Sequence, residues 1–198
     1  MKAAITNLSK SCAIFLFFLP ALFSAAAGQQ QSHKDISAVF AEGKISNGQY
    51  TNEYFGLTLK PDGAQFVPQG AFISPEGKRA RLVYAQRDAA TWADKYSVAL
   101  LADALSANPS IKSPEQYLRI VRHNFEHEGL VTAQEETATK ISGVPFIKVV
   151  MKTRDSKPHF QAMYSSFLKG YIFSVQIEAP SVERAQQIVD TLITFKTK

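Results

Sequence analysis

The pattern in this chain with the clearest chemical potential is His123-Asn-Phe-Glu-His127. Two histidines four residues apart lie on the same side of a helix, where both imidazoles can bind one Zn²⁺. The order His-x-x-Glu-His is that of the inverzincin peptidases, in which the glutamate is the general base. A hydrolytic zinc ion normally has a third protein ligand, and Glu178 or Glu183 can be nominated, although neither lies in a supporting pattern.

The helix that must carry these residues is well defined by the sequence. Ser113-Pro-Glu-Gln116 is a capping box with proline at the first helical position, and Gly129 ends the pattern. The apolar stripe between these limits consists of Tyr117, Leu118, Val121 and Phe125. His123 and His127 therefore project toward solvent. We interpret them as surface histidines and predict no metal site, while a zinc hydrolase using His123, Glu126 and His127 is the alternative.

No other catalytic pattern is present. The chain has no Gly-rich phosphate loop, no G-x-S-x-G turn and no cysteine pair. Four aspartates are dispersed and are expected to be solvated surface acids, namely Asp62, Asp88, Asp94 and Asp103. We therefore predict that the protein is not an enzyme, with no catalytic residues and no bound cofactor.

Residues 1–27 have the features of an export signal. Lys2 and Lys10 supply a positive segment, Ala13–Phe23 an apolar core, and Ala25–Ala27 a small-residue cleavage site. The apolar core is too short to span a bilayer, so no transmembrane anchor is expected after cleavage. We predict an exported protein, periplasmic or extracellular.

The remainder of the chain limits the possible partners. The single cysteine, Cys12, lies within the predicted signal, so residues 28–198 can form neither a disulfide nor a thiolate nucleophile. Part of the net charge of +5 also belongs to the signal, and the other basic residues are scattered. A nucleic-acid partner is not supported. We expect another envelope protein as the partner of a non-catalytic accessory or binding protein.

Alternation of apolar and polar residues predicts a mainly antiparallel domain. Three consecutive strands are expected at 144–153, 160–169 and 171–178, followed after Ser181 by a helix whose apolar stripe includes Leu192 and Ile193. Residues 64–80 contain Pro68, Gly70, Pro75 and Gly77 and are predicted to be a loop, either a surface excursion or a binding loop. Further strands are expected at 49–52, 55–59, 81–87, 97–105 and 137–142.

The domain organisation follows from these elements. Residues 28–47 are interpreted as an N-terminal tether with a possible short helix, which Ser32-His-Lys-Asp35 could cap. Residues 48–198 are interpreted as a single domain. Aromatic residues at alternating positions favour a packed core. A carrier of a small apolar ligand is an alternative, and it requires a cavity lined by residues such as Phe146, Phe160, Tyr164 and Phe173.

Several local sequences resemble the PsbP/Mog1-like superfamily. They are Gly48-Gln-Tyr-Thr-Asn-Glu-Tyr-Phe-Gly-Leu-Thr-Leu59 with Pro61, Ile141-Ser-Gly-Val-Pro-Phe146, Lys169-Gly-Tyr-Ile-Phe-Ser174 and Leu192-Ile-Thr-Phe195. The resemblance implies an α+β fold with a central antiparallel β-sheet flanked by helices on both faces, an α/β/α sandwich. It implies no particular function, because members of the superfamily range from a photosystem II subunit to a nuclear-import factor.

Overall fold

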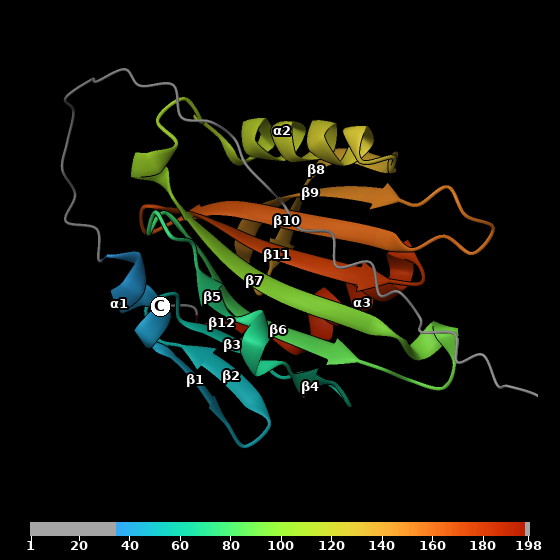
Figure 1. Cartoon of the computed structure of the whole chain (residues 1–198), viewed down its shortest axis with the longest axis horizontal. Helices are drawn as coiled ribbons and strands as arrows, with labels where there is room; N and C mark the ends of the chain where they lie inside the picture. Colours follow the sequence, from blue (N-terminus) through green and yellow to red (C-terminus); the bar gives the residue numbers. More distant parts are fainter. Residues whose placement is uncertain (1–34, 197–198) are drawn as a thin grey trace, which may run out of the picture. The chain divides into compact units, whose positions relative to one another are not determined.

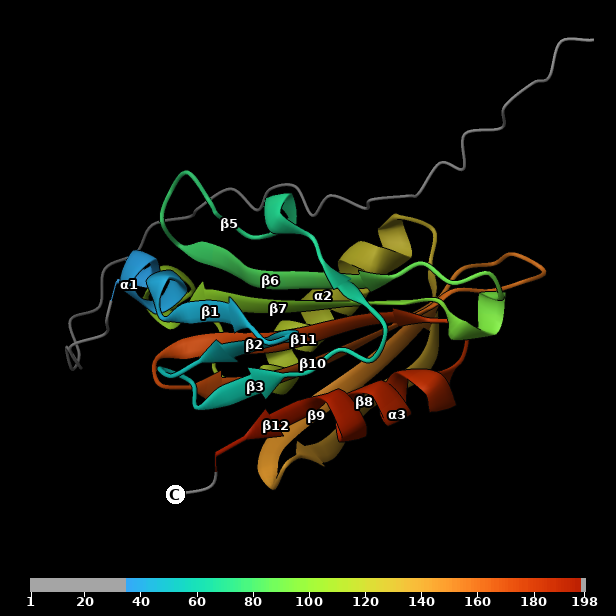
Figure 2. The same ribbon diagram turned by 90° about the horizontal axis from the view of Figure 1, so that it is seen from below.

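The computed structural model describes residues 35–196, which belong to one compact unit. The predicted export signal lies outside the described residues. Two antiparallel sheets and three α-helices make up the described part of the chain (Figures 1 and 2). Within residues 35–196, no helix has the length and apolar character needed to cross a membrane.

The larger sheet contains the strands that alternation predicted most clearly. In spatial order it consists of β4 (Gln65–Phe66), β6 (Arg79–Arg87), β7 (Tyr96–Ala104), β11 (Tyr171–Ala179), β10 (Phe160–Leu168), β9 (Val144–Lys152) and β8 (Val131–Ile141), with β5 (Phe72–Ile73) also paired to β6. The expected strands in 97–105 and 144–178 are confirmed. Strand β8 begins at Val131, before the predicted start at 137.

The smaller sheet has the order β1 (Gly43–Ser46), β2 (Gln49–Asn52), β3 (Leu57–Leu59) and β12 (Ile193–Phe195). Asn47 and Gly48 join β1 to β2 with φ of 49° and 71°, as a two-residue hairpin turn requires. The prediction that the last helix continues through Ile193 is wrong. This helix ends at Leu192, because Ile193–Phe195 pairs with Leu57–Leu59 instead.

The segment 64–80 is more ordered than the predicted loop. It contains β4, a 3-10 turn η1 (Pro68–Gly70) and β5, and both short strands pair with β6. Gly70 permits close packing here, since a Cβ at this position would lie 2.6 Å from the Cβ of Tyr84. Two further 3-10 turns, η2 (Trp92–Asp94) and η3 (Leu105–Ala107), flank β7.

Three α-helices complete the fold, namely α1 (Ile36–Ala41), α2 (Pro114–His127) and α3 (Val182–Leu192). The short N-terminal helix is present, and its N-cap is Asp35, whose carboxylate accepts from the backbone N–H of Ser37. Ser113 and Ser181 cap the other two helices as their sequences predict. Helix α2 packs on β8, β9 and β10, and α3 packs on β10, β11 and β12.

The main core joins the two sheets. Phe55 lies next to β3, and its ring is 4.9 Å from that of Phe173 on β11, while Phe195 on β12 is 5.8 Å from the same ring. The smaller sheet therefore covers part of the larger one. The expectation of a helical layer on both faces is not confirmed, because the described residues hold three helices and the smaller sheet occupies much of the space that such a layer would fill.

Candidate functional site

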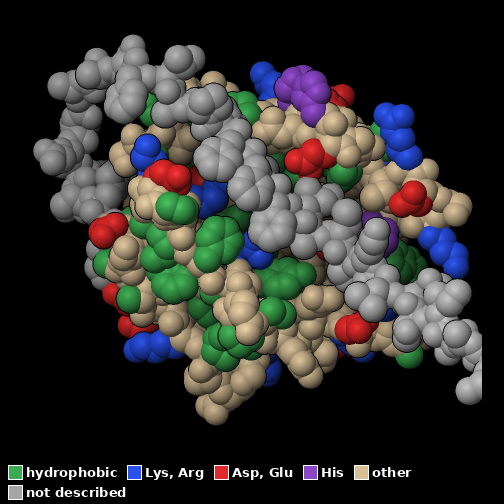
Figure 3. Space-filling model, in the orientation of Figure 1, with side chains coloured by type: hydrophobic (Ala, Val, Ile, Leu, Met, Phe, Trp, Pro, Cys, Tyr) green, Lys and Arg blue, Asp and Glu red, His purple; other side chains and the backbone are tan. Residues whose placement is uncertain are grey.

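His123 and His127 lie on α2 and are exposed, as predicted from the apolar stripe. Buried Val121 and Phe125 fix the opposite side of the helix against the sheet. The two Nε2 atoms are 3.0 Å apart, and the ring planes meet at 78°. Histidine side chains are visible on the molecular surface over α2 in Figure 3. The helix therefore brings the two imidazoles into direct contact in front of solvent.

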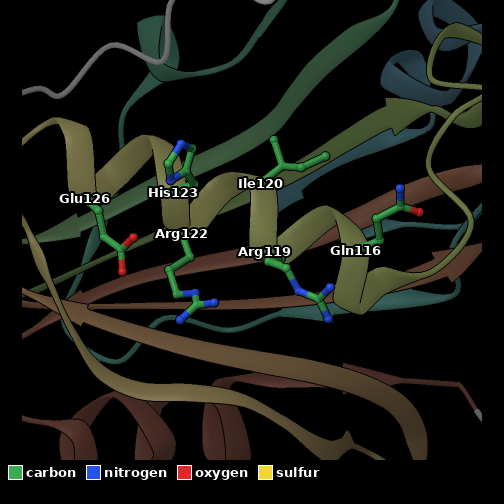
Figure 4. Close-up of a pocket in the computed structure, with 6 residues that line it drawn as sticks. All are labelled: Gln116, Arg119, Ile120, Arg122, His123 and Glu126. Atoms are coloured by element: carbon green, nitrogen blue, oxygen red, sulfur yellow. The ribbon is translucent and has the colours of Figure 1, made fainter.

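A hollow of about 400 Å³ runs along α2 beside these histidines. Figure 4 shows the six side chains that line it, which are Gln116, Arg119, Ile120, Arg122, His123 and Glu126. Arg122 is ion-paired with Glu136, with 3.0 Å between Nε and Oε1, and Glu126 accepts a 2.8 Å hydrogen bond from Thr132. These contacts hold both side chains toward β8.

The arrangement does not assemble the zinc-hydrolase site. Across residues 35–196, no group of three histidine, cysteine, aspartate or glutamate residues is placed to hold a metal ion. Glu178 lies on β11, where its carboxylate accepts a hydrogen bond from the Ser97 hydroxyl. Glu183 lies in the first turn of α3. The third ligands considered from the sequence therefore do not join His123 and His127.

The proposed lining of an apolar cavity is instead packed. Phe146 lies 6.4 Å from Phe173 and 5.7 Å from Phe195 between ring centroids, and Tyr164 is 1 % exposed. Phe160 is half-buried against the same cluster. A second hollow, of about 80 Å³, lies beside β2 and β3 and is lined by none of these residues. The geometry therefore favours core packing for these rings.

A row of polar side chains crosses strands β6, β7, β11 and β10 of the larger sheet. Gln86 on β6 is paired with Ser97 on β7, Ser97 with Glu178 on β11, and Glu178 with Gln161 on β10. Directly opposed residues of antiparallel strands project from the same face. These four residues, called the polar row below, are therefore neighbours although they are far apart in the sequence.

The centre of the polar row is a carboxylate in an environment of low polarity. Burial raises the pKa of Glu178, while the hydrogen bond from Ser97 and the nearby His159 oppose part of that change. The Ser97 hydroxyl lies 3.3 Å from Oε2. Burial also raises the pKa of Tyr84, which lies beside Ser97. The contacts of Glu178 with Ser97 and His159 therefore offset only part of the cost of burying its negative charge.

Gln161 ends the polar row with an unused donor. Its side chain is 5 % exposed, and its Nε2 has no hydrogen-bond partner among the described residues. Buried amide donors in folded proteins are almost always paired. An exposed aromatic pair lies near this position, since Trp92 contacts His159 with 4.1 Å between ring centroids, and His159 directly precedes β10.

A second buried polar group lies at the opposite end of β7. Asp103 is 3 % exposed, so the prediction that it is a solvated surface acid is wrong. Its carboxylate is ion-paired with Arg79 and accepts a 3.0 Å hydrogen bond from the Tyr117 hydroxyl. Burial is the main reason that the pKa of Tyr117 is raised. The contacts of Asp103 with β6 and α2 indicate a structural role.

The solved structures with limited similarity to this chain include LpqN and a cyanobacterial PsbP. LpqN, described as involved in cell envelope biogenesis of Mycobacterium tuberculosis, is 15 % identical and has a TM-score of 0.45, with 70 % of this chain and 82 % of LpqN covered. The cyanobacterial PsbP of Synechocystis sp. PCC 6803 is 13 % identical and has a TM-score of 0.46, with 75 % and 91 % covered.

Sequence comparison adds no relative. No protein-family model matches the chain, and no curated protein matches it. What is known of the polar row therefore comes from the geometry of this chain alone. Sequence reasoning missed it because its members come from four strands, and only the pairing register places them together. The one available signal was the polar side of the strand Tyr171–Ala179, which carries Gln176 and Glu178.

Proposed function

We propose that the protein is a non-catalytic binding module of the cell envelope, which holds an extended segment of another envelope protein against the polar row. The observation that carries this proposal is the unpaired Nε2 of Gln161 directly across the sheet from the partly buried carboxylate of Glu178. The sequence features of an export signal in residues 1–27 support the compartment.

A polypeptide backbone matches the chemistry of these two side chains. Gln161 needs an acceptor, and Glu178 needs a donor that compensates its charge better than Ser97 does alone. A residue in an extended chain presents its C=O and its N–H toward the same side. Neighbouring strands are about 4.8 Å apart, so one such residue can reach both side chains.

Charged ligands fit less well. An anion would accept from Gln161 but would be repelled by Glu178, whereas a cation would pair with Glu178 and leave the amide donor unused. A neutral hydroxyl group, as in a sugar, also supplies a donor and an acceptor. The protein partner is preferred because the polar row crosses four neighbouring strands in register, from exposed Gln86 to Gln161, which gives a strip long enough for an extended segment.

Site-specific photo-crosslinking in intact cells tests this function. A photoreactive residue at position 86, at the exposed end of the polar row, should give a defined adduct with one envelope protein. The matched control is the same residue at Glu76, which is exposed in the turn between β5 and β6. Identical adducts at both positions, or a protease-resistant adduct of glycan character, would contradict the proposal.

Two substitutions connect the adduct to the chemistry of the row. Gln161→Met keeps the length of the side chain and removes the unpaired donor, and Glu178→Gln removes the charge. Both should strongly reduce the adduct at position 86. Gln161→Met also removes a buried amide that has no hydrogen-bond partner. Its free energy of unfolding should therefore equal that of wild type or exceed it by about 1 kcal/mol. Loss of binding without loss of stability excludes misfolding as the cause.

A further inference from the structure

The convergence of His123 and His127 suggests a second property of the protein, independent of the polar row. The geometry points to a surface site for Cu²⁺ or a related divalent transition metal, held by the two Nε2 atoms. Imidazole nitrogen is a preferred ligand of copper, nickel and zinc. The i, i+4 spacing allows both imidazoles to reach one ion, and the structure adds the observation that the two Nε2 atoms are in direct contact.

The observed separation suits two donors on one metal. Two nitrogens at about 2.0 to 2.1 Å from the same ion are about 2.9 Å apart at a right angle and about 3.4 Å apart in a tetrahedron. The two Nε2 atoms are 3.0 Å apart. The two rings share a hydrogen bond at this separation, so a bound ion would replace that hydrogen bond with little change in the distance between the nitrogens, least of all in square-planar geometry.

The surroundings of the pair favour a cation. His127 is the last residue of α2, where the helix dipole places partial negative charge. Glu126 and Glu128 are exposed on either side of it. Arg122 lines the same hollow as His123, and its charge is paired with Glu136. Arg119, one turn before His123, remains as a positive charge that opposes binding and is exposed to solvent.

The site is expected to be open. Since no third histidine, cysteine or carboxylate of the described chain joins the pair, water or a partner's side chain would fill the other coordination positions. The order of affinity should follow the general order for divalent ions, with Cu²⁺ above Ni²⁺ and Zn²⁺. Because the chelate requires the helical i, i+4 spacing, the folded protein should bind the metal better than the unfolded chain.

Titration of the untagged protein with Cu²⁺ at pH 7.5 tests this site, followed by electron paramagnetic resonance and by thermal unfolding. Wild type should bind one equivalent with nitrogen coordination and unfold at a higher temperature with copper present. His123→Ala and His127→Ala should each lose the nitrogen-coordinated equivalent and the thermal shift. His159→Ala removes a histidine elsewhere and should keep both.

A relocated pair separates geometry from histidine content. In the double variant Arg119→His with His127→Ala, positions 119 and 123 again have i, i+4 spacing, so copper binding should return. In Glu128→His with His127→Ala the spacing is five residues, and binding should stay absent. Equal binding by all variants would place the copper elsewhere and overturn the inference, as would binding by the single variants or failure of the relocated pair.

Discussion

Two acids on the larger sheet illustrate how partners determine the role of a buried charge. Asp103 has a guanidinium and a phenol hydroxyl as partners, and both are supplied by the protein itself. Within residues 35–196, Glu178 has only the Ser97 hydroxyl as a hydrogen-bond partner of its carboxylate. A charge that is fully paired within the fold contributes to structure, whereas an incompletely paired one has capacity to bind another molecule.

The raised pKa of Glu178 predicts a specific pH dependence of stability. Because this pKa lies above its ordinary value of 4.5 in the folded protein, the folded state binds the proton more tightly than the unfolded chain does. The stability contributed by this proton is complete below the ordinary value and is lost as the pH rises through the raised one. Glu178→Gln should therefore be more stable than wild type at pH 7, by an amount that shrinks toward pH 4.

Urea denaturation at several pH values measures this difference. Glu128→Gln provides the control, because Glu128 is exposed after the end of α2. Its free energy of unfolding should differ little from that of wild type across the range. A constant offset for Glu178→Gln at every pH would show that the carboxyl group does not titrate differently in the folded and unfolded states.

The ion pair of Asp103 should contribute far more to stability than a surface pair. Asp103→Asn leaves the partly buried guanidinium of Arg79 without its counter-charge and should lower the free energy of unfolding by about 2–3 kcal/mol. Asp88→Asn removes an exposed ion pair with Lys95, in which the charged atoms are 2.8 Å apart. This variant should change the free energy of unfolding by less than about 1 kcal/mol. Similar losses for the two variants would refute the structural role of Asp103.

At the scale of elements, the two long helices have the same type of N-terminal cap. The Ser113 hydroxyl accepts from the N–H of Gln116, and the Ser181 hydroxyl accepts from the N–H of Arg184. Ser113→Ala and Ser181→Ala should each reduce stability by about 1 kcal/mol in chemical denaturation. Ser156→Ala in the exposed turn between β9 and β10 is the control, with an expected change within about 0.5 kcal/mol.

The elements predicted correctly from sequence share length and periodicity. Strands of nine residues, such as Tyr171–Ala179, display several alternations, and α2 displays a cap, a stripe and a final glycine. Short strands show too little alternation for consistent prediction: β2 and β3 were expected from sequence, whereas β1, β4 and β5 were missed. Ile193 was assigned to the last helix, because its pairing with Leu59 on β3 depends on residues far away in the sequence.

The same reasoning applies to the candidate sites. The histidine pair could be located from sequence, because a helix relates residues four positions apart. The polar row could not, since Gln86 and Gln161 lie on one line across the sheet only through the register of the two strands between them. Burial of Asp103 was likewise invisible, because its partners Arg79 and Tyr117 come from separate elements.

For the whole molecule, the aromatic cluster around Phe173 joins the two sheets into one folding unit. Phe173 is fully buried and contacts Phe55, Phe146 and Phe195, so it links the smaller sheet with β9 and β11. Phe173→Ala should reduce the free energy of unfolding by about 3–5 kcal/mol. This is a large part of the total stability of about 5–15 kcal/mol that is usual for a domain.

Phe72→Ala makes the same chemical change at the edge of the larger sheet. Phe72 is 41 % exposed and lies 4.9 Å from the Arg81 guanidinium, so its loss should reduce stability by no more than about 1 kcal/mol. Far- and near-ultraviolet circular dichroism should give one coincident transition for wild type and for both variants. If Phe173→Ala instead produced two separate transitions, the sheets would be independent units, and the polar row could be tested on the larger sheet alone.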